Sequence, residues 1–375
     1  MTIDKPHVIV VGAGIVGASI AWHLAAKHNQ TVTVTVVAPD IAGGGTATPN
    51  SFAWLNANFN NARPYFDVRH RSMKHWHNMI DQIPGLSELA RWNGNVQWQQ
   101  DEADLANHIK QHASWGYKTE KITNDEVLHR EPWLVETCLP AWGWAASLPE
   151  DGSIEPALAA RTMIADACAH GATVREETVE RLLFEDGKIV GVVTPNGPIK
   201  ADHVVLAAGL GTVSLAAAVG VTVPVHSRPG LIVHSKPVAT RLLNGLAISN
   251  GPHMRQTVQG RIIAGRHYSG GSPTTDPAAE AQVFFKKVQA MFRSDLDGLP
   301  CPPLELDFYT VGYRPDPEDG LPILGDSGKP GLTLAVMHSG VTLAAFVGQT
   351  LSDLVATGTK DKALDQFALS RFNKV

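Results

Sequence analysis

The chain has 375 residues, which is too long for one small module and predicts two domains of ordinary size. Hydrophobic residues make up 44% of the chain, enough for a full core, so an intrinsically disordered protein is excluded. There are 31 Lys and Arg against 36 Asp and Glu, the formal net charge is -5, and no dense basic tract occurs. This charge pattern argues against a nucleic-acid-binding protein.

The three cysteines, Cys138, Cys168 and Cys301, lie far apart in the sequence and form no CxxC pair. Neither a metal site nor a disulfide framework is therefore expected, and a reducing cytoplasm is the predicted location. The apolar segment at 8–24 contains three glycines and His23 and lacks basic flanks. We expect neither a transmembrane helix nor a signal peptide there.

The first elements along the chain form a strand, a glycine-rich turn, a helix and a second strand. The apolar run at 7–11 leads into Gly12-x-Gly14-x-x-Gly17, then into a helical pattern over 18–26 and a strand over 31–37. Such a unit binds a dinucleotide, because the glycines allow a tight turn and close approach to a pyrophosphate, and the helix N-terminus stabilises the phosphates. The alternative is that the glycines serve packing alone.

The second strand does not end in the acidic residue that usually binds the adenosine ribose, about 20 residues after the glycines. That position holds Ala38, and Asp40 follows two residues later. Either Asp40 binds the ribose from the loop, or Asp40 is a solvated turn residue and backbone and water hold the ribose. No basic residue occurs there, which argues against a 2′-phosphate.

Five later segments resemble one family of flavoproteins, the D-amino-acid oxidase (DAO) family, which includes glycine oxidase and sarcosine oxidase. The Gly-rich, polar segment 43–57 resembles the loop that wraps the pyrophosphate and ribityl chain of FAD. Segment 171–179 resembles the strand that meets the adenine, and VVLAAG at 204–209 resembles a second strand beside the flavin. VGYRPDPEDGLPILG at 311–325 resembles the motif GxRPxxPDGLPxIG, and MHSGVTLA at 337–344 resembles HSGxTLAP.

The resemblance implies an α/β fold, α+β overall, with a Rossmann-like FAD-binding domain interleaved with an antiparallel-sheet substrate domain. Residues 1–84, 149–222 and 311–375 are assigned to the FAD-binding domain, and residues 85–148 and 223–310 to the substrate-binding domain. The FAD is expected to be non-covalent, because sarcosine oxidases tether the flavin through a cysteine and segment 311–313 contains none.

The resemblance also implies which residues bind FAD. In the family, the helix N-terminus within 337–344 faces the N1–O2 edge of the flavin and stabilises negative charge there. The predicted cofactor-binding residues are Gly12, Gly14, Ile15, Val16, Gly17, Ala38, Asp40, Thr46, Thr48, Asn50, Ser51, Phe52, Ala53, Trp54, Val179, Ala207, Ala208, Gly209, Arg314, His338, Ser339, Gly340, Val341 and Thr342.

The activity that the resemblance implies is oxidation of the C–N bond of a small amino acid: a D-amino acid, glycine, an N-alkyl amino acid or an opine. A hydride goes to flavin N5, and the imine hydrolyses to an oxo acid. Arg314 matches the family arginine that binds the substrate carboxylate. The alternative for Arg314 is a structural salt bridge to Asp316, Glu318 or Asp319.

Three further residues are weaker candidates for the catalytic site. His338 is expected either to donate to the flavin or to cap the helix that follows it. Arg255 and His267 belong to strands that should face the pocket, where each can also be structural, and Tyr268 can shape the substrate wall.

Three other functions compete with this one. One is a flavin-binding protein without catalysis, which the presence of Arg314 disfavours. An NAD-linked dehydrogenase would share the glycine motif but leaves residues 311–344 unexplained. A flavin subunit of a larger amine or opine dehydrogenase complex would pass electrons to a partner or quinone instead of oxygen. An oligomer is compatible with either flavin hypothesis, and no motif indicates a metal.

Overall fold

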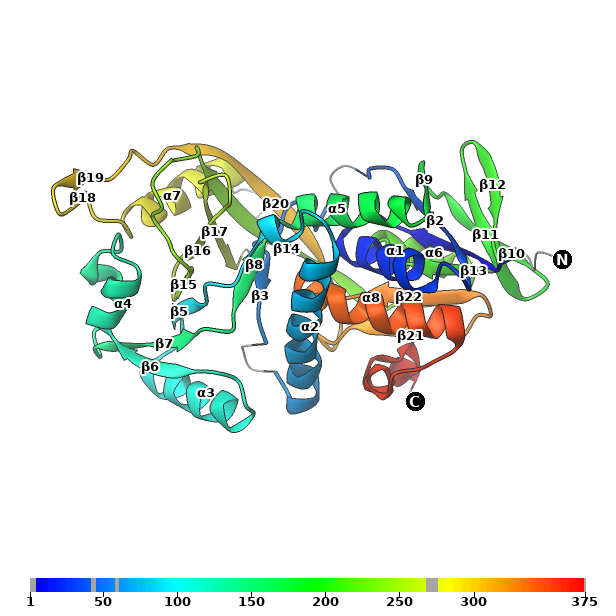
Figure 1. Cartoon of the computed structure of the whole chain (residues 1–375), viewed down its shortest axis with the longest axis horizontal. Helices are drawn as coiled ribbons and strands as arrows, with labels where there is room; N and C mark the ends of the chain where they lie inside the picture. Colours follow the sequence, from blue (N-terminus) through cyan, green and yellow to red (C-terminus); the bar gives the residue numbers. More distant parts are fainter. Residues whose placement is uncertain (1–4, 42–44, 58–60, 268–275, 374–375) are drawn as a thin grey trace.

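The structure, a computed structural model, describes residues 5–41, 45–57, 61–267 and 276–373. Two large sheets, one of six strands and one of eight, organise the chain and lie toward opposite ends of the molecule (Figure 1). One sheet is mostly parallel and the other mostly antiparallel. This architecture confirms the α/β fold class that the resemblance implied.

The six-stranded sheet is parallel except at one edge. Its spatial order is β21 (Ile323–Asp326), β22 (Leu332–Val336), β13 (His203–Leu206), β1 (His7–Val11), β2 (Thr33–Ala38) and β9 (Thr173–Glu176). Only the edge pair of β21 and β22 is antiparallel among these pairings. The central strands β1 and β2 are buried along nearly their whole length, as expected for a sheet covered on both faces.

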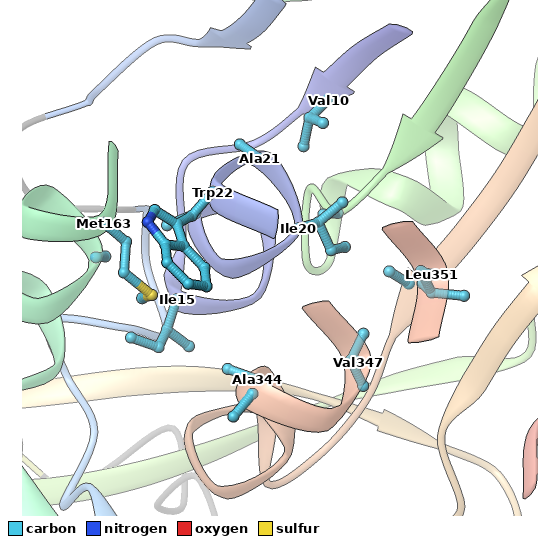
Figure 2. Packing of buried hydrophobic residues seen from close by; sticks show 14 of the residues in the cluster. Val10, Ile15, Ile20, Ala21, Trp22, Met163, Ala344, Val347 and Leu351 are labelled. Atoms are coloured by element: carbon cyan, nitrogen blue, oxygen red, sulfur yellow. The ribbon is translucent and has the colours of Figure 1, made fainter. Parts of the chain in front are cut away.

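Helices cover one face of this sheet. They are α1 (Ile15–His28), α5 (Pro156–Ala169) and α8 (Gly340–Thr357), and α2 (Arg63–Gln82) packs against α8. Helix α1 contacts both α5 and α8, and Figure 2 shows Ile20 of α1 beside Val347 and Leu351 of α8. The opposite face is covered by α6 (Gly211–Ala217) and by a small sheet of β10 (Arg181–Glu185), β11 (Lys188–Thr194) and β12 (Gly197–Lys200).

The eight-stranded sheet forms the second part of the molecule. Its spatial order is β20 (Leu306–Pro317), β14 (Val225–Ser235), β17 (Ile262–His267), β16 (His253–Gln256), β15 (Leu246–Ser249), β5 (Asn95–Trp98), β7 (Trp144–Leu148) and β6 (Glu120–Thr123). The sheet is antiparallel except for the pairing of β15 with β5. Helix α7 (Pro277–Gln289) packs Phe284, Phe285 and Val288 into the core that this sheet forms.

Shorter elements complete the chain. The three-stranded sheet β3 (Trp54–Leu55), β8 (Gly152–Ile154) and β4 (Ala90–Arg91) lies between the two large sheets. The others are α3 (Glu102–Ser114), α4 (Asn124–Arg130), β18 (Asp295–Leu296), β19 (Leu299–Pro300) and the 3-10 turns Ser87–Leu89, Glu136–Cys138, Lys362–Phe367 and Leu369–Asn373. Within the described ranges, no helix has the length and apolar content needed to cross a membrane.

The strands of the two large sheets alternate along the chain, and one of them crosses a predicted domain boundary. Strand β20 belongs to the eight-stranded sheet and runs from residue 306 to 317, so the boundary at 311 divides it. It pairs with β14 from Val225 to Ser235, which sets Arg314 opposite Arg228. The pair of β14 and β20 extends from the eight-stranded sheet toward the six-stranded sheet (Figure 1).

Candidate active site

A cavity of about 1050 Å³ extends from the ends of the parallel strands to the eight-stranded sheet. It is at the upper limit of the roughly 300–1,000 Å³ typical of ligand pockets, so it can hold a large ligand. All the predicted cofactor-binding residues line it, with the exception of Gly17. The structure therefore brings these residues together, and their contacts with a cofactor stay a prediction.

Two glycines of the N-terminal turn are required by the protein backbone itself. Gly12 has φ of +107°, and a Cβ there would lie 2.5 Å from the carbonyl oxygen of Ala207. A Cβ on Gly17 would lie 2.0 Å from the carbonyl oxygen of Gly12. Gly17 therefore serves the packing of helix α1 against the turn, while Gly14 faces the cavity.

Two helix N-termini open into the cavity. Helix α1 begins after Gly14, and helix α8 begins after Ser339, which has φ of +58°; neither N-cap residue uses its side chain as a cap. Thr48 lies in segment 43–57, the predicted FAD-binding loop. Its hydroxyl oxygen accepts a hydrogen bond from the backbone N–H of Ile15 at 3.0 Å. Free N–H groups and the helix dipole at these two ends favour negatively charged groups of a ligand.

The far end of the cavity is built by the ends of β2 and β9. Ala38, Asp40 and Val179, the residues predicted to bind the adenosine, all line the cavity, and Glu180 lines it too. Asp40 is exposed and Ala38 is buried. Both positions considered for the ribose thus face the same part of the cavity.

Arg314 lies at the opposite end, with its guanidinium directed to uncharged groups. Nη1 donates to His338 Nε2 at 3.3 Å, and Nη2 donates to the carbonyl oxygen of Pro229 at 3.3 Å. Burial and the charge of nearby Arg228 lower the pKa of Arg314 from its ordinary value. A half-buried guanidinium of this kind is suited to bind a carboxylate in a fixed orientation.

The three carboxylates considered as structural partners of Arg314 bind other residues instead. Asp316 pairs with Arg228 at 2.7 Å, and Asp319 pairs with Arg371 at 2.7 Å. Glu318 lies 3.9 Å from His226. Among the described residues, no ion pair to Arg314 is formed, which leaves its charge available to a ligand.

His338 is neutral at physiological pH. Burial and then the adjacent Arg314 lower its pKa to about 4. Its Nε2 accepts from Arg314, so the proton is on Nδ1, which lies 2.9 Å from Ser339 Oγ. Neutral His338 can therefore fix the orientation of the Arg314 guanidinium without adding a charge.

The structure does not bring Arg255 to the cavity. This side chain is only 2% exposed, and its Nη1 forms an ion pair with Glu155 at 2.9 Å. Its Nε donates to the carbonyl oxygen of Phe52 at 2.7 Å, so Arg255 supports the loop that lines the cavity. The expectation that its strand turns Arg255 toward the pocket is wrong, because the side chain lies beneath the lining, on Glu155.

Replacing Arg255 by methionine is expected to lower the free energy of unfolding by roughly 3–5 kcal/mol, because Glu155 would be left buried and unpaired. Chemical denaturation of the two proteins measures this loss. Replacing Glu155 by leucine in the same protein should restore much of the stability. A stable Arg255→Met protein that has lost only activity would contradict the structural role.

The structure tests the predicted positions of His267 and Tyr268 only in part. The backbone of His267 belongs to β17, opposite Gly230, and its side chain lies outside the described residues. Tyr268 also lies outside them.

A polar network that no sequence motif indicated lies behind the cavity wall. Trp54 donates from Nε1 to Asp151 at 2.7 Å, and Asp151 also accepts hydrogen bonds from Tyr117 and Asn95. Burial raises the pKa of Asp151 to about 7. Since the four residues are far apart in sequence, no local pattern could have joined them.

Arg69 is a further residue of the site that the sequence patterns had not singled out. It lies on α2, lines the cavity and is 6% exposed. The signal was present in the sequence, because Tyr65, Arg69, Ser72 and Trp76 recur at helical spacing and share one face. All four residues are buried, and Arg69 is the charged one among them.

Several known proteins are similar to this chain. Glycine oxidase of Bacillus subtilis is 23% identical over 92% of both chains. The crystal structure of glycine oxidase from Geobacillus kaustophilus matches with a TM-score of 0.83 at 23% identity, covering 98% of this chain and 99% of that one. The bifunctional protein ThiO/ThiG of Nostoc sp. is 26% identical over 98% of this chain.

The chain spans about half the length of that bifunctional relative, 55%. The family model of the DAO type, described as FAD dependent oxidoreductase, matches residues 7–354. That match includes both large sheets and the whole cavity lining described above. The chain therefore belongs to the DAO family of FAD-dependent oxidoreductases.

Proposed function

We propose that the protein oxidises the C–N bond of a small amino acid whose carboxylate is bound by Arg314. Membership of the DAO family makes it an FAD-binding oxidoreductase. The observation that carries the finer proposal is a half-buried guanidinium at the cavity end opposite the adenosine site, with no ion pair among the described residues. A substrate carboxylate supplies the missing counter-charge.

The residues that line the cavity fit FAD along its whole length. Ala38, Asp40 and Val179 would hold the adenosine, and the N-terminus of α1 the pyrophosphate. The N-terminus of α8 would meet the pyrimidine edge of the flavin. When bound, FAD supplies a two-electron acceptor for a hydride from the substrate.

The protein itself orients the substrate and needs no strong base for this reaction. Arg314 fixes the carboxylate, and neutral His338 fixes Arg314. An amine that reaches the site uncharged loses its α-hydrogen as hydride and becomes an iminium ion, which water later hydrolyses to an oxo acid and ammonium or a protonated amine. Positioning of this kind accounts for a large part of enzymatic rate enhancement.

Anaerobic mixing of the purified holoenzyme with glycine, N-methylglycine and both enantiomers of alanine tests the proposal. We expect at least one amino acid to bleach the visible absorbance of the flavin, and its decarboxylated amine to act poorly. No bleaching by any amino acid of a broad panel would overturn the proposal.

Admission of air to the reduced protein then identifies the electron acceptor. Rapid return of the flavin colour supports an oxidase. A flavin that stays reduced in air and is reoxidised by a quinone supports the alternative, a flavin subunit that passes electrons to a partner. The sequence and the fold are compatible with both acceptors.

The FAD should be bound without a covalent link, because no cysteine occurs in segment 311–313 and Cys301 is not among the cavity residues. Acid precipitation of the yellow protein is expected to release all of the flavin into the supernatant. Colour that stays in the washed pellet would contradict this assignment.

A further inference from the structure

Arg69 gives the substrate end of the cavity a second cation. Helix α2 carries it on the same buried face as Ser72 and Trp76, three and seven residues further on. The Ser72 hydroxyl donates to the carbonyl oxygen of Thr342 at 2.7 Å, and Trp76 Nε1 donates to that of Val341 at 3.0 Å. This face of α2 therefore lies on the first turn of α8.

The position of Arg69 on that face brings it toward the residues that precede α8. Side chains of a helix lean toward its N-terminus, so Arg69 extends beyond Ser72 in the direction of the cavity. The charges of both Arg314 and Arg69 contribute to the low pKa of His338. Arg69 and Arg314 thus face the same turn from two different elements, α2 and β20.

Asn56 holds the guanidinium of Arg69 in place. Arg69 Nε donates to the backbone carbonyl of Asn56 at 3.1 Å, and Nη2 donates to its side-chain oxygen at 3.0 Å. Both acceptors are uncharged. The two hydrogen bonds therefore fix the orientation of the Arg69 guanidinium, and they leave its positive charge without a counter-charge.

No carboxylate of the described residues forms an ion pair with Arg69. Asp151 is the acidic residue whose pKa Arg69 affects, but its carboxylate binds Trp54, Tyr117 and Asn95 instead. Arg69 is only 6% exposed, and a buried guanidinium without an ion pair is unfavourable unless a ligand brings an anion. The cavity therefore offers two sites for carboxylates.

We propose that Arg69 binds a second carboxylate of the substrate, which makes the preferred substrate a secondary amine with a carboxylate on each side of the nitrogen. This inference rests on the proposed function, in which Arg314 binds the first carboxylate. The CH–NH bond loses a hydride to FAD and a proton to water, giving C=N. Water then cleaves the imine into an amino acid and an oxo acid.

A substrate with a neutral group in place of the second carboxylate would leave the charge of Arg69 without a counter-charge. We therefore expect the enzyme to prefer the dicarboxylate strongly over such a substrate. Iminodiacetate and its monoamide have nearly the same shape and differ by one negative charge. The efficiency of flavin reduction is the rate constant of reduction divided by the Kd of the substrate. For the wild-type protein, we expect this ratio to be at least 30-fold higher with iminodiacetate than with the monoamide.

Binding without turnover gives an independent readout. Thiodiacetate has two carboxylates and no oxidisable amine, and methylthioacetate has one carboxylate. Titration of each into the oxidised holoenzyme, followed by the change in the visible flavin spectrum, gives both Kd values. Arg69→Gln should raise the Kd of thiodiacetate at least 30-fold and change that of methylthioacetate less than threefold.

A matched control lies on the same helix. Arg63 is half-exposed and pairs with Asp67 at 2.7 Å, so Arg63→Gln should leave both Kd values unchanged. Arg69→Lys keeps a charge and should retain part of the preference for thiodiacetate. If Arg69→Gln fails to fold, the wild-type preference and the Arg69→Lys protein still decide the matter.

The outcomes separate this inference from the proposed function. Wild-type protein that is reduced by N-methylglycine and shows no preference for iminodiacetate over its monoamide overturns the role of Arg69 alone. Equal losses for both thioethers in Arg69→Gln also overturn it, and assign Arg69 to the flavin or the scaffold. Protein that no amino acid reduces, and that binds neither thioether, overturns the proposed function as well.

Discussion

Replacement of Arg314 by alanine is expected to reduce kcat/KM for the amino-acid substrate by about 30-fold to several thousand-fold. This range corresponds to the roughly 2–5 kcal/mol lost when one partner of a buried, hydrogen-bonded charge pair is removed. Flavin content and Tm should change little, because the guanidinium donates hydrogen bonds to His338 and Pro229 and forms no ion pair with a carboxylate of the described residues. Steady-state kinetics and the flavin-to-protein ratio measure these quantities.

The control for this variant is a pair of substrates, the amino acid and its decarboxylated amine. Arg314→Ala should damage the first reaction and leave the second, already slow, nearly unchanged. Arg314→Lys should also be poor, since an ammonium keeps the charge and loses the two-pronged geometry. Equal losses on both substrates would assign Arg314 to the scaffold.

Local patterns in the sequence predict the elements around the cofactor well. The strand, glycine turn and helix at the N-terminus occur where the spacing predicted them, although α1 begins at Ile15 and not at residue 18. The reason is physical, because a parallel βαβ unit is specified by contiguous residues with a strong periodicity.

The partners of charged residues could not be read from the sequence. Arg255 and Arg314 both belong to strands of the eight-stranded sheet. Arg255 forms an ion pair with Glu155, a hundred residues away in the sequence, whereas Arg314 forms none among the described residues. Each outcome depends on which distant carboxylate the tertiary fold brings near. The same holds for Arg69. The helical spacing of the sequence indicates its helix and its buried face, but it does not indicate that Asn56 accepts the hydrogen bond of its guanidinium.

Substitution of Gly14 in the glycine turn is expected to abolish FAD binding, whereas substitution of Gly17 is expected to destabilise the fold. Gly14 precedes α1 with φ of -65° and ψ of 172°, a conformation open to any residue, and it lines the cavity. A valine there should therefore be tolerated by the polypeptide and should occupy the space of the pyrophosphate. We expect Gly14→Val protein to be folded and colourless.

Loss of FAD should also lower the Tm of Gly14→Val to that of wild-type apoprotein, and no further. Ligand that binds only the folded state adds about 2.7 kcal/mol at a concentration 100 times its Kd, and this contribution disappears with the flavin. Circular dichroism, the visible spectrum and thermal unfolding of both apoproteins test this. Full flavin occupancy in the variant would show that the pyrophosphate lies elsewhere.

Gly17→Ala is the matched control, since its added methyl group would lie 2.0 Å from the carbonyl oxygen of Gly12. This clash involves backbone only, so the turn must shift and the apoprotein itself should lose roughly 1–3 kcal/mol or more. The two variants should thus separate: Gly14→Val loses the cofactor and keeps the stability of the apoprotein, and Gly17→Ala loses stability with or without FAD. If Gly14→Val destabilised the apoprotein as much as Gly17→Ala does, both glycines would serve packing, and the turn would give no support to a phosphate site at Gly14.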